Sequence, residues 1–150
     1  MIESRIIKLR SLIKTNNLDG YIIPKNDAYF SEYSSPDRLR IITNFDGSAG
    51  FAVILRKKNF LFVDGRYTIQ AKIQAGKNFR IFEIPKFSTK NIIKKTKKRL
   101  LLGFDPQLFT NLTLKKNFSK DFNLLPIAEN LIDKIYKNNS KKTISPFYNL

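Results

Sequence analysis

The segment FAVILRKKNFLFVDGRYTIQA, residues 51–71, carries the clearest structural signal in this chain of 150 residues. Two apolar runs, at residues 51–55 and 60–63, are separated by a short polar segment at 56–59, which is typical of an antiparallel hairpin. From residue 67 to 75 the apolar spacing becomes helical. The segment therefore predicts two paired strands followed by a helix.

The remaining sequence alternates between helical and extended patterns. Apolar residues recur at helical spacing over residues 2–13, and we expect Gly20 to close this helix. Residues 21–23 indicate a short strand ended by Pro24. Further strands are predicted at 79–84, 100–104 and 122–125, and further helices at 91–98, 110–118 and 128–136, with Gly76 capping the helix at 67–75. This order predicts an α/β fold with one sheet covered by helices, and the hairpin makes that sheet mixed.

Two segments between these elements favour loops. Residues 25–40, KNDAYFSEYSSPDRLR, carry Asp, Ser and Pro too densely for a strand and predict an ordered loop with room for a turn of helix. Residues 44–50, NFDGSAG, precede a strand, whereas phosphate-binding loops follow a strand and precede a helix. We interpret this segment as a tight turn of small residues that lets a neighbouring backbone approach.

The charge of the chain allows two interpretations. Lys and Arg number 28 against 12 Asp and Glu, for a net charge of +16, which would favour phosphate backbones or anionic surfaces. The basic residues lie throughout the sequence, as on an ordinary solvated surface, and the heavy use of Ile, Asn, Lys and Phe is typical of a genome-wide bias. We favour the second interpretation, and binding to nucleic acid remains the alternative.

The sequence contains no His and no Cys. A disulfide framework, a thiolate zinc site and a thiol nucleophile are therefore excluded, and the composition fits a reducing, cytoplasmic compartment. Charged residues interrupt the N-terminal apolar residues too often for a signal peptide or a membrane span, so no membrane association is expected. Serine nucleophiles have no His to take their proton, which leaves a Ser-Lys pair only formally open.

The polar corner after the second hairpin strand holds the residues of most interest. Asp64 is placed to cap the following helix, as Asp46 and Asp105 are placed to serve turns, and Gly65 permits a sharp turn. Arg66 stands in the first helical turn, where a cation is unfavourable for the helix dipole. Spacing alone favours an ion pair of Arg66 with Asp64, Asp46 or Glu32.

Several motifs stand in an order that resembles a known family. YIIPKNDAYFSEYSSPDRLRIITNFDGSAGFAVIL, followed by FVDGRYTIQA and LGFDPQLFT, is similar to the N-terminal, creatinase/prolidase-type domain of Xaa-Pro aminopeptidases, in particular the aminopeptidase P branch. The resemblance covers nearly the whole chain. It implies a single mixed sheet of about six strands with helices on both faces and a ribonuclease H-like motif.

The resemblance also implies what this chain lacks. Such enzymes cleave the bond before proline with two divalent metal ions, of the Mn or Zn class, held in a C-terminal domain of the pita-bread fold. We expect residues 1–136 to form the non-catalytic domain and residues 137–150 to form a linker toward that missing domain. The chain by itself is expected to hold no cofactor and to be inactive.

By the same resemblance, Arg66 is the substrate-binding residue. Asp64 and Gly65 would set its direction, Tyr67 would support it by packing, and Asp46 is a further supporting residue. The domain is expected to shape access for Xaa-Pro peptides and to contribute to subunit contacts in a homo-oligomer. A basic nucleic-acid-binding domain and a stand-alone scaffold domain are the alternatives.

Overall fold

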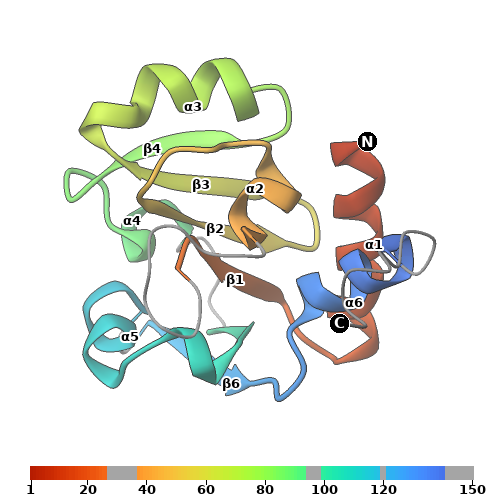
Figure 1. The fold of residues 1–150 in the computed structure, drawn as a ribbon. Coiled ribbons are helices and arrows are strands. Elements are labelled where there is room, and N and C mark those ends of the chain that lie inside the picture. The colour runs from red at the N-terminus through yellow and green to blue at the C-terminus, as the bar shows by residue number, and fades with distance from the viewer. Residues whose placement is uncertain (27–36, 94–98, 119–120, 141–150) are drawn as a thin grey trace, which may run out of the picture.

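A computed structural model describes residues 1–26, 37–93, 99–118 and 121–140, which form one mixed sheet between two layers of helices (Figure 1). The strands are β1 (Gly20–Pro24), β2 (Gly50–Leu55), β3 (Asn59–Asp64), β4 (Arg80–Ile84), β5 (Leu100–Phe104) and β6 (Phe122–Pro126). The helices are α1 (Ile2–Thr15), α2 (Arg38–Thr43), α3 (Thr68–Ala75), α4 (Thr89–Ile93), α5 (Asn111–Phe118) and α6 (Leu131–Ser140), with 3-10 helices η1 (Gly65–Tyr67) and η2 (Pro106–Leu108).

The sheet has the strand order β4-β3-β2-β1-β5-β6. β2 runs antiparallel to β1 and β3, and the pairs β3–β4, β1–β5 and β5–β6 are parallel. The predicted hairpin is confirmed, with Phe51 opposite Phe62 and Val53 opposite Phe60. Because every strand except β2 points the same way, their carboxyl ends lie together, next to the start of β2. We call this side of the sheet the carboxyl edge.

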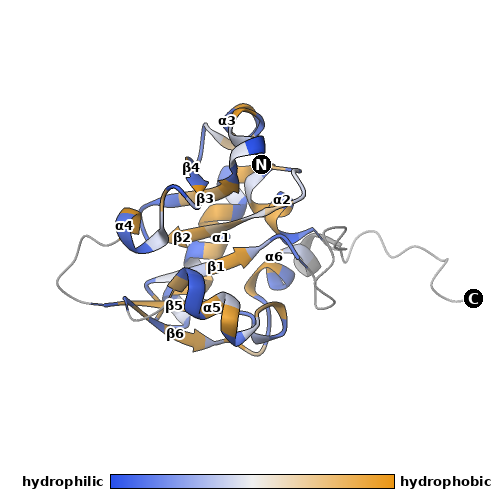
Figure 2. Ribbon diagram, turned by 90° about the vertical axis from the view of Figure 1, so that its left-hand side faces the viewer, coloured by the Kyte–Doolittle hydropathy of each residue, from blue (hydrophilic) through white to orange (hydrophobic). Residues whose placement is uncertain are grey.

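The core has two halves, one on each face of the sheet. Alternate residues of the strands face opposite ways, so that Ala52 and Leu61 pack on one face while Phe51 and Phe62 pack on the other. Helices α1, α2, α3 and α6 cover the first face, and α4 and α5 cover the second. Figure 2 shows the apolar strands in orange between helices that carry blue, hydrophilic positions. The prediction of helices on both faces is thus confirmed.

The first helix ends earlier than its expected cap. α1 stops at Thr15, and Asn17 takes the left-handed conformation after it, with φ of 56°. Asn adopts this conformation more readily than most residues, so no glycine is required there. Gly20 instead begins β1, and the prediction that it closes the helix was wrong. Gly76 follows α3 as expected, but with a right-handed φ of −63°.

The turn of helix allowed for in the segment at 25–40 and the last helix both extend further than predicted. The end of this segment contributes to a full helix, α2, whose N-terminus is capped by Asp37 through a 3.1 Å hydrogen bond from the Arg40 N–H. Residues 27–36 lie outside the described residues, as do residues 94–98 of the expected basic helix. α6 continues to Ser140, into the expected linker, of which residues 141–150 lie outside the described part.

Within the described ranges, no helix has the length and apolar character needed to cross a membrane.

Candidate functional site at the carboxyl edge

The corner after β3 is organised by Asp64. Its Oδ1 accepts hydrogen bonds from the Arg66 backbone N–H at 2.9 Å and from Arg66 Nε at 3.2 Å. The backbone hydrogen bond, followed by that of the side chain, lowers the pKa of Asp64. The predicted cap and the Asp64–Arg66 ion pair are both present. Because 72% of the Arg66 side chain is exposed, this pair adds little stability and mainly restrains the direction of the guanidinium.

Tyr67 supplies a second restraint on Arg66. The Arg66 guanidinium carbon lies 5.2 Å from the centre of the Tyr67 ring, within the range of a cation–π contact. The Tyr67 and Phe45 rings form a T-shaped pair, with the two centroids 6.0 Å apart and the planes at 75°. The Tyr67 hydroxyl lies 2.5 Å from the Ser48 hydroxyl, so the two share a hydrogen bond. Arg66 therefore rests on a ring that is itself fixed at two points.

Asp46 contacts a different element from the one expected. Its Oδ1 accepts hydrogen bonds from Gln70 Nε2 at 2.6 Å and from Gln74 Nε2 at 2.9 Å, and its own N–H donates to Gln74 Oε1 at 3.2 Å. The hydrogen bond from Gln74 is the main reason why the pKa of Asp46 is lowered. Asp46 thus ties the loop before β2 to α3. Glu32, the third partner considered for Arg66, lies outside the described residues.

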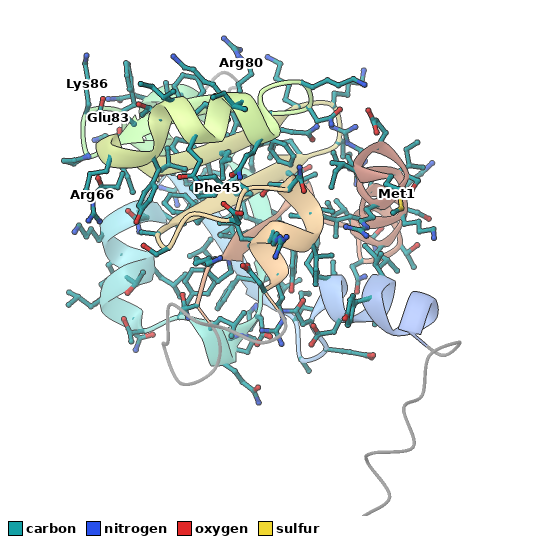
Figure 3. All side chains as sticks on the ribbon, turned by 45° about the horizontal axis from the view of Figure 1, so that its top comes forward. Met1, Phe45, Arg66, Arg80, Glu83 and Lys86 are labelled. Atoms are coloured by element: carbon teal, nitrogen blue, oxygen red, sulfur yellow. The ribbon has the colours of Figure 1, made fainter. Side chains whose placement is uncertain are left out.

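Gly65 has a different role from the one inferred from sequence. Its φ lies outside the left-handed region, so the turn into η1 does not itself require glycine. A β-carbon at this position would instead collide with Oε1 of Glu83, at the end of β4. Figure 3 shows Arg66 and Glu83 extending on the same side of the molecule. The sequence did not indicate Glu83, because Glu83 lies beside Gly65 only through the pairing of Val63 with Glu83 in parallel strands.

Gly50 bears out the interpretation of the NFDGSAG segment. Its φ of +148° is one that other residues rarely adopt, and a β-carbon there would lie 2.9 Å from the Phe62 carbonyl oxygen. The segment therefore turns into β2 in close contact with the neighbouring backbone.

Other polar groups of the carboxyl edge have structural partners. Lys25, only 8% exposed, forms an ion pair with Asp37. Asp105 caps η2 through the Gln107 N–H at 2.9 Å and accepts a hydrogen bond from the Asn130 side chain at 3.0 Å. The expected turn role of Asp105 is confirmed, whereas the buried Lys25 carried no signal in the sequence that marked it.

The described residues do not fit a metal centre or an aromatic stacking platform. Among them, no three carboxylates gather in a way that could hold a metal ion, and the sequence has no His or Cys to add. Most of the described Phe side chains are buried in the core, whereas Phe82 and Phe109 are half-buried and Phe87 is 38% exposed. Proteins that bind single-stranded nucleic acid expose such rings for stacking.

Fold and site together define an α/β domain whose carboxyl edge presents the oriented guanidinium of Arg66. The chain belongs to the creatinase/prolidase N-terminal domain family, whose profile matches residues 5–135. It is 34% identical over 144 residues to the probable Xaa-Pro aminopeptidase P of Coprinopsis cinerea and 34% identical over 146 residues to that of Laccaria bicolor. These matches cover 89% and 88% of this chain but only 23% and 22% of the relatives' lengths.

Solved structures show the same fold. An X-prolyl aminopeptidase from Caenorhabditis elegans, described as a cytosolic enzyme with a di-nuclear active site, superposes with a TM-score of 0.79 at 24% identity. That match covers 92% of this chain and 26% of the other. The N-terminal domain of the cytoplasmic peptidase PepQ from Mycobacterium tuberculosis superposes with a TM-score of 0.67 at 22% identity, over 88% of this chain and 98% of that domain. The predicted family and fold class are therefore confirmed.

Proposed function

We propose that this chain is the non-catalytic N-terminal domain of a metal-dependent Xaa-Pro aminopeptidase, an enzyme that removes the N-terminal residue before proline. The names of the curated relatives support this, as does the 22–23% of their length that the chain matches. Two divalent metal ions, of the Mn or Zn class, would belong to a following pita-bread domain, where such ions activate water and polarise the scissile carbonyl. None of that chemistry is assigned to the residues described above.

The observation that carries the proposal is the restrained, exposed guanidinium of Arg66. Asp64 binds its Nε and the Tyr67 ring lies against it, while 72% of the side chain remains exposed. A guanidinium can donate two parallel hydrogen bonds to a carboxylate or carbonyl oxygen. In the proposed enzyme, Arg66 donates such bonds to the peptide substrate, with Asp64, Gly65, Tyr67 and Asp46 as supporting residues.

Three further assignments belong to the same proposal. The domain walls the active-site cleft and so restricts access to short, flexible peptides. It contributes subunit contacts to a homo-oligomer, and the enzyme works in the cytoplasm.

The test compares the protein made from the native gene with the chain of residues 1–150. First, the intact mass shows whether the gene product exceeds the 17.5 kDa of this chain. Both proteins are then assayed for release of the N-terminal residue from an Xaa-Pro peptide, with and without a chelator. We expect chelator-sensitive hydrolysis by the larger product and none by residues 1–150. Hydrolysis by residues 1–150 alone, or a native product of 17.5 kDa, contradicts the proposal.

A further inference from the structure

We infer that Ser48, in the loop between α2 and β2, is a positioning residue for the Arg66 guanidinium and acts through the ring of Tyr67. The inference rests on the proposed function, in which Arg66 binds the peptide. It starts from two contacts on opposite parts of one side chain: the Tyr67 hydroxyl lies 2.5 Å from the Ser48 hydroxyl, and the Tyr67 ring lies 5.2 Å from the Arg66 guanidinium carbon.

The Tyr67 ring is held along its length. The ring packs in a T-shaped contact on Phe45, which is fully buried, and its hydroxyl is bound by Ser48. Phe45 is fixed in turn, because its backbone N–H donates to the Thr43 hydroxyl at 3.0 Å. Without the Ser48 hydroxyl, the Tyr67 hydroxyl would lose this hydrogen bond, which is the directional contact of the pair. Packing on Phe45 alone would then let the ring tilt.

The loop that carries Ser48 is well placed to act as an anchor. Before Ser48, Asp46 is bound by Gln70 and Gln74 of α3, and after it Gly50 is paired with Val63 of β3. Ser48 is thereby fixed relative to both elements that flank the corner. The restraint passes from the loop to the Tyr67 ring and from the ring to Arg66, while Asp64 holds Nε of the same guanidinium.

On this inference, the hydrogen bond between Ser48 and Tyr67 serves to fix the direction of the ring and not to stabilise the fold. The ring of Tyr67 is only partly buried, so water could replace Ser48 as the partner of its hydroxyl. A water would satisfy the hydrogen bond without fixing the ring direction. Removal of the Ser48 hydroxyl should therefore change substrate binding more than folding, because the geometry of a binding group must be held by its supporting residues.

The experiment measures kcat/KM on an Xaa-Pro peptide with the full-length protein, in the variants Ser48→Ala, Tyr67→Phe, Arg66→Ala and their double combinations. We expect Ser48→Ala and Tyr67→Phe each to lower kcat/KM by about 3–10-fold, the range for one neutral hydrogen bond. The Ser48→Ala/Tyr67→Phe double variant should be no worse than either single variant. In the Arg66→Ala background, Ser48→Ala should have no further effect, because its influence passes through the guanidinium.

The controls separate positioning from folding. Ser11→Ala, at an exposed site on α1, changes the same residue type far from the corner and should leave kcat/KM unchanged. Urea unfolding midpoints of Ser48→Ala and Ser11→Ala should agree closely. The inference fails, and the proposed function stands, if Arg66→Ala lowers kcat/KM but Ser48→Ala does not. The same conclusion follows if Ser48→Ala lowers kcat/KM by the same factor in the Arg66→Ala background as in the unmodified enzyme. If Arg66→Ala itself has no effect, the assigned role of Arg66 fails, and the inference with it.

Discussion

Arg38 of α2 and Asp133 of α6 form a two-point ion pair, in which Arg38 Nε and Nη2 donate to the two carboxylate oxygens of Asp133 at 2.8 and 3.0 Å. Their side chains are 14% and 26% exposed. Burial alone would lower the pKa of Arg38, but the hydrogen bonds and charge of Asp133 outweigh it and raise the pKa. The pair joins two helices that also lie against α1 on the same face of the sheet (Figure 1).

Arg38→Ala should destabilise the domain by about 1–3 kcal/mol, because it leaves the half-buried Asp133 carboxylate without its cation. Arg38→Lys should lose less, since it keeps the charge but not the two-point geometry. Urea unfolding of residues 1–150 measures both. The Arg38→Ala/Asp133→Ala double variant should lose less than the sum of the single losses. Additive losses would mean that the two residues are not coupled.

Gln74→Ala should raise the pKa of Asp46 toward its ordinary value of 3.8, because Gln74 provides the main hydrogen bond that lowers it. A carboxyl whose folded pKa is lowered stabilises the fold above its unfolded pKa, and this contribution is lost as the pH falls through the folded value. The pH window in which this contribution is lost therefore lies below the ordinary value of 3.8. NMR titration of the Asp46 carboxyl follows the change, with Asp64 as an internal control. An unchanged Asp46 titration would remove Gln74 as the cause.

Gly50→Ala should cost about 1–3 kcal/mol, because residue 50 has a φ of +148° and its new methyl group would press on the Phe62 carbonyl. Gly65→Ala should cost less than 1 kcal/mol, roughly the scale of an ordinary surface change, because the Glu83 carboxylate is the end of a flexible side chain that can turn away. Thermal or urea unfolding ranks the two variants. Equal losses would contradict the distinction between a backbone constraint at Gly50 and a side-chain contact at Gly65.

The local features of the corner could be predicted from the sequence. The hairpin follows from alternating apolar residues around a polar turn, and the cap by Asp64 follows from an acidic residue directly before a helical pattern. Each depends on residues within a few positions of one another. α2 was harder to predict, because a helix of only six residues that starts shortly after a proline shows too little helical periodicity in the sequence. This helix is stabilised by the burial of Leu39 and Ile42.

Contacts between distant segments could not be predicted in the same way. Ser48 and Tyr67 are 19 residues apart, and Arg38 and Asp133 are 95 apart, so that only the folded sheet and helices bring each pair together. Spacing made Asp46 a candidate partner of Arg66, but the helical spacing of Gln70 and Gln74 offers Asp46 two amide donors instead. The substrate-binding role of Arg66 was predicted only from the family resemblance, because spacing alone favoured a local ion pair for this residue.

The role of Arg66 is tested most directly by kcat/KM of the full-length protein on an Xaa-Pro peptide, comparing Arg66→Ala with Arg80→Ala. Arg80 is also an exposed arginine, but it begins β4 and so lies at the amino ends of the strands, away from Arg66 at the carboxyl edge (Figure 3). The loss of a charge-assisted hydrogen bond predicts a fall of about 10–100-fold for Arg66→Ala, with metal content and unfolding midpoint unchanged. Arg80→Ala should match the unmodified enzyme. Equal kcat/KM for the two variants would contradict the assignment of Arg66 to the substrate.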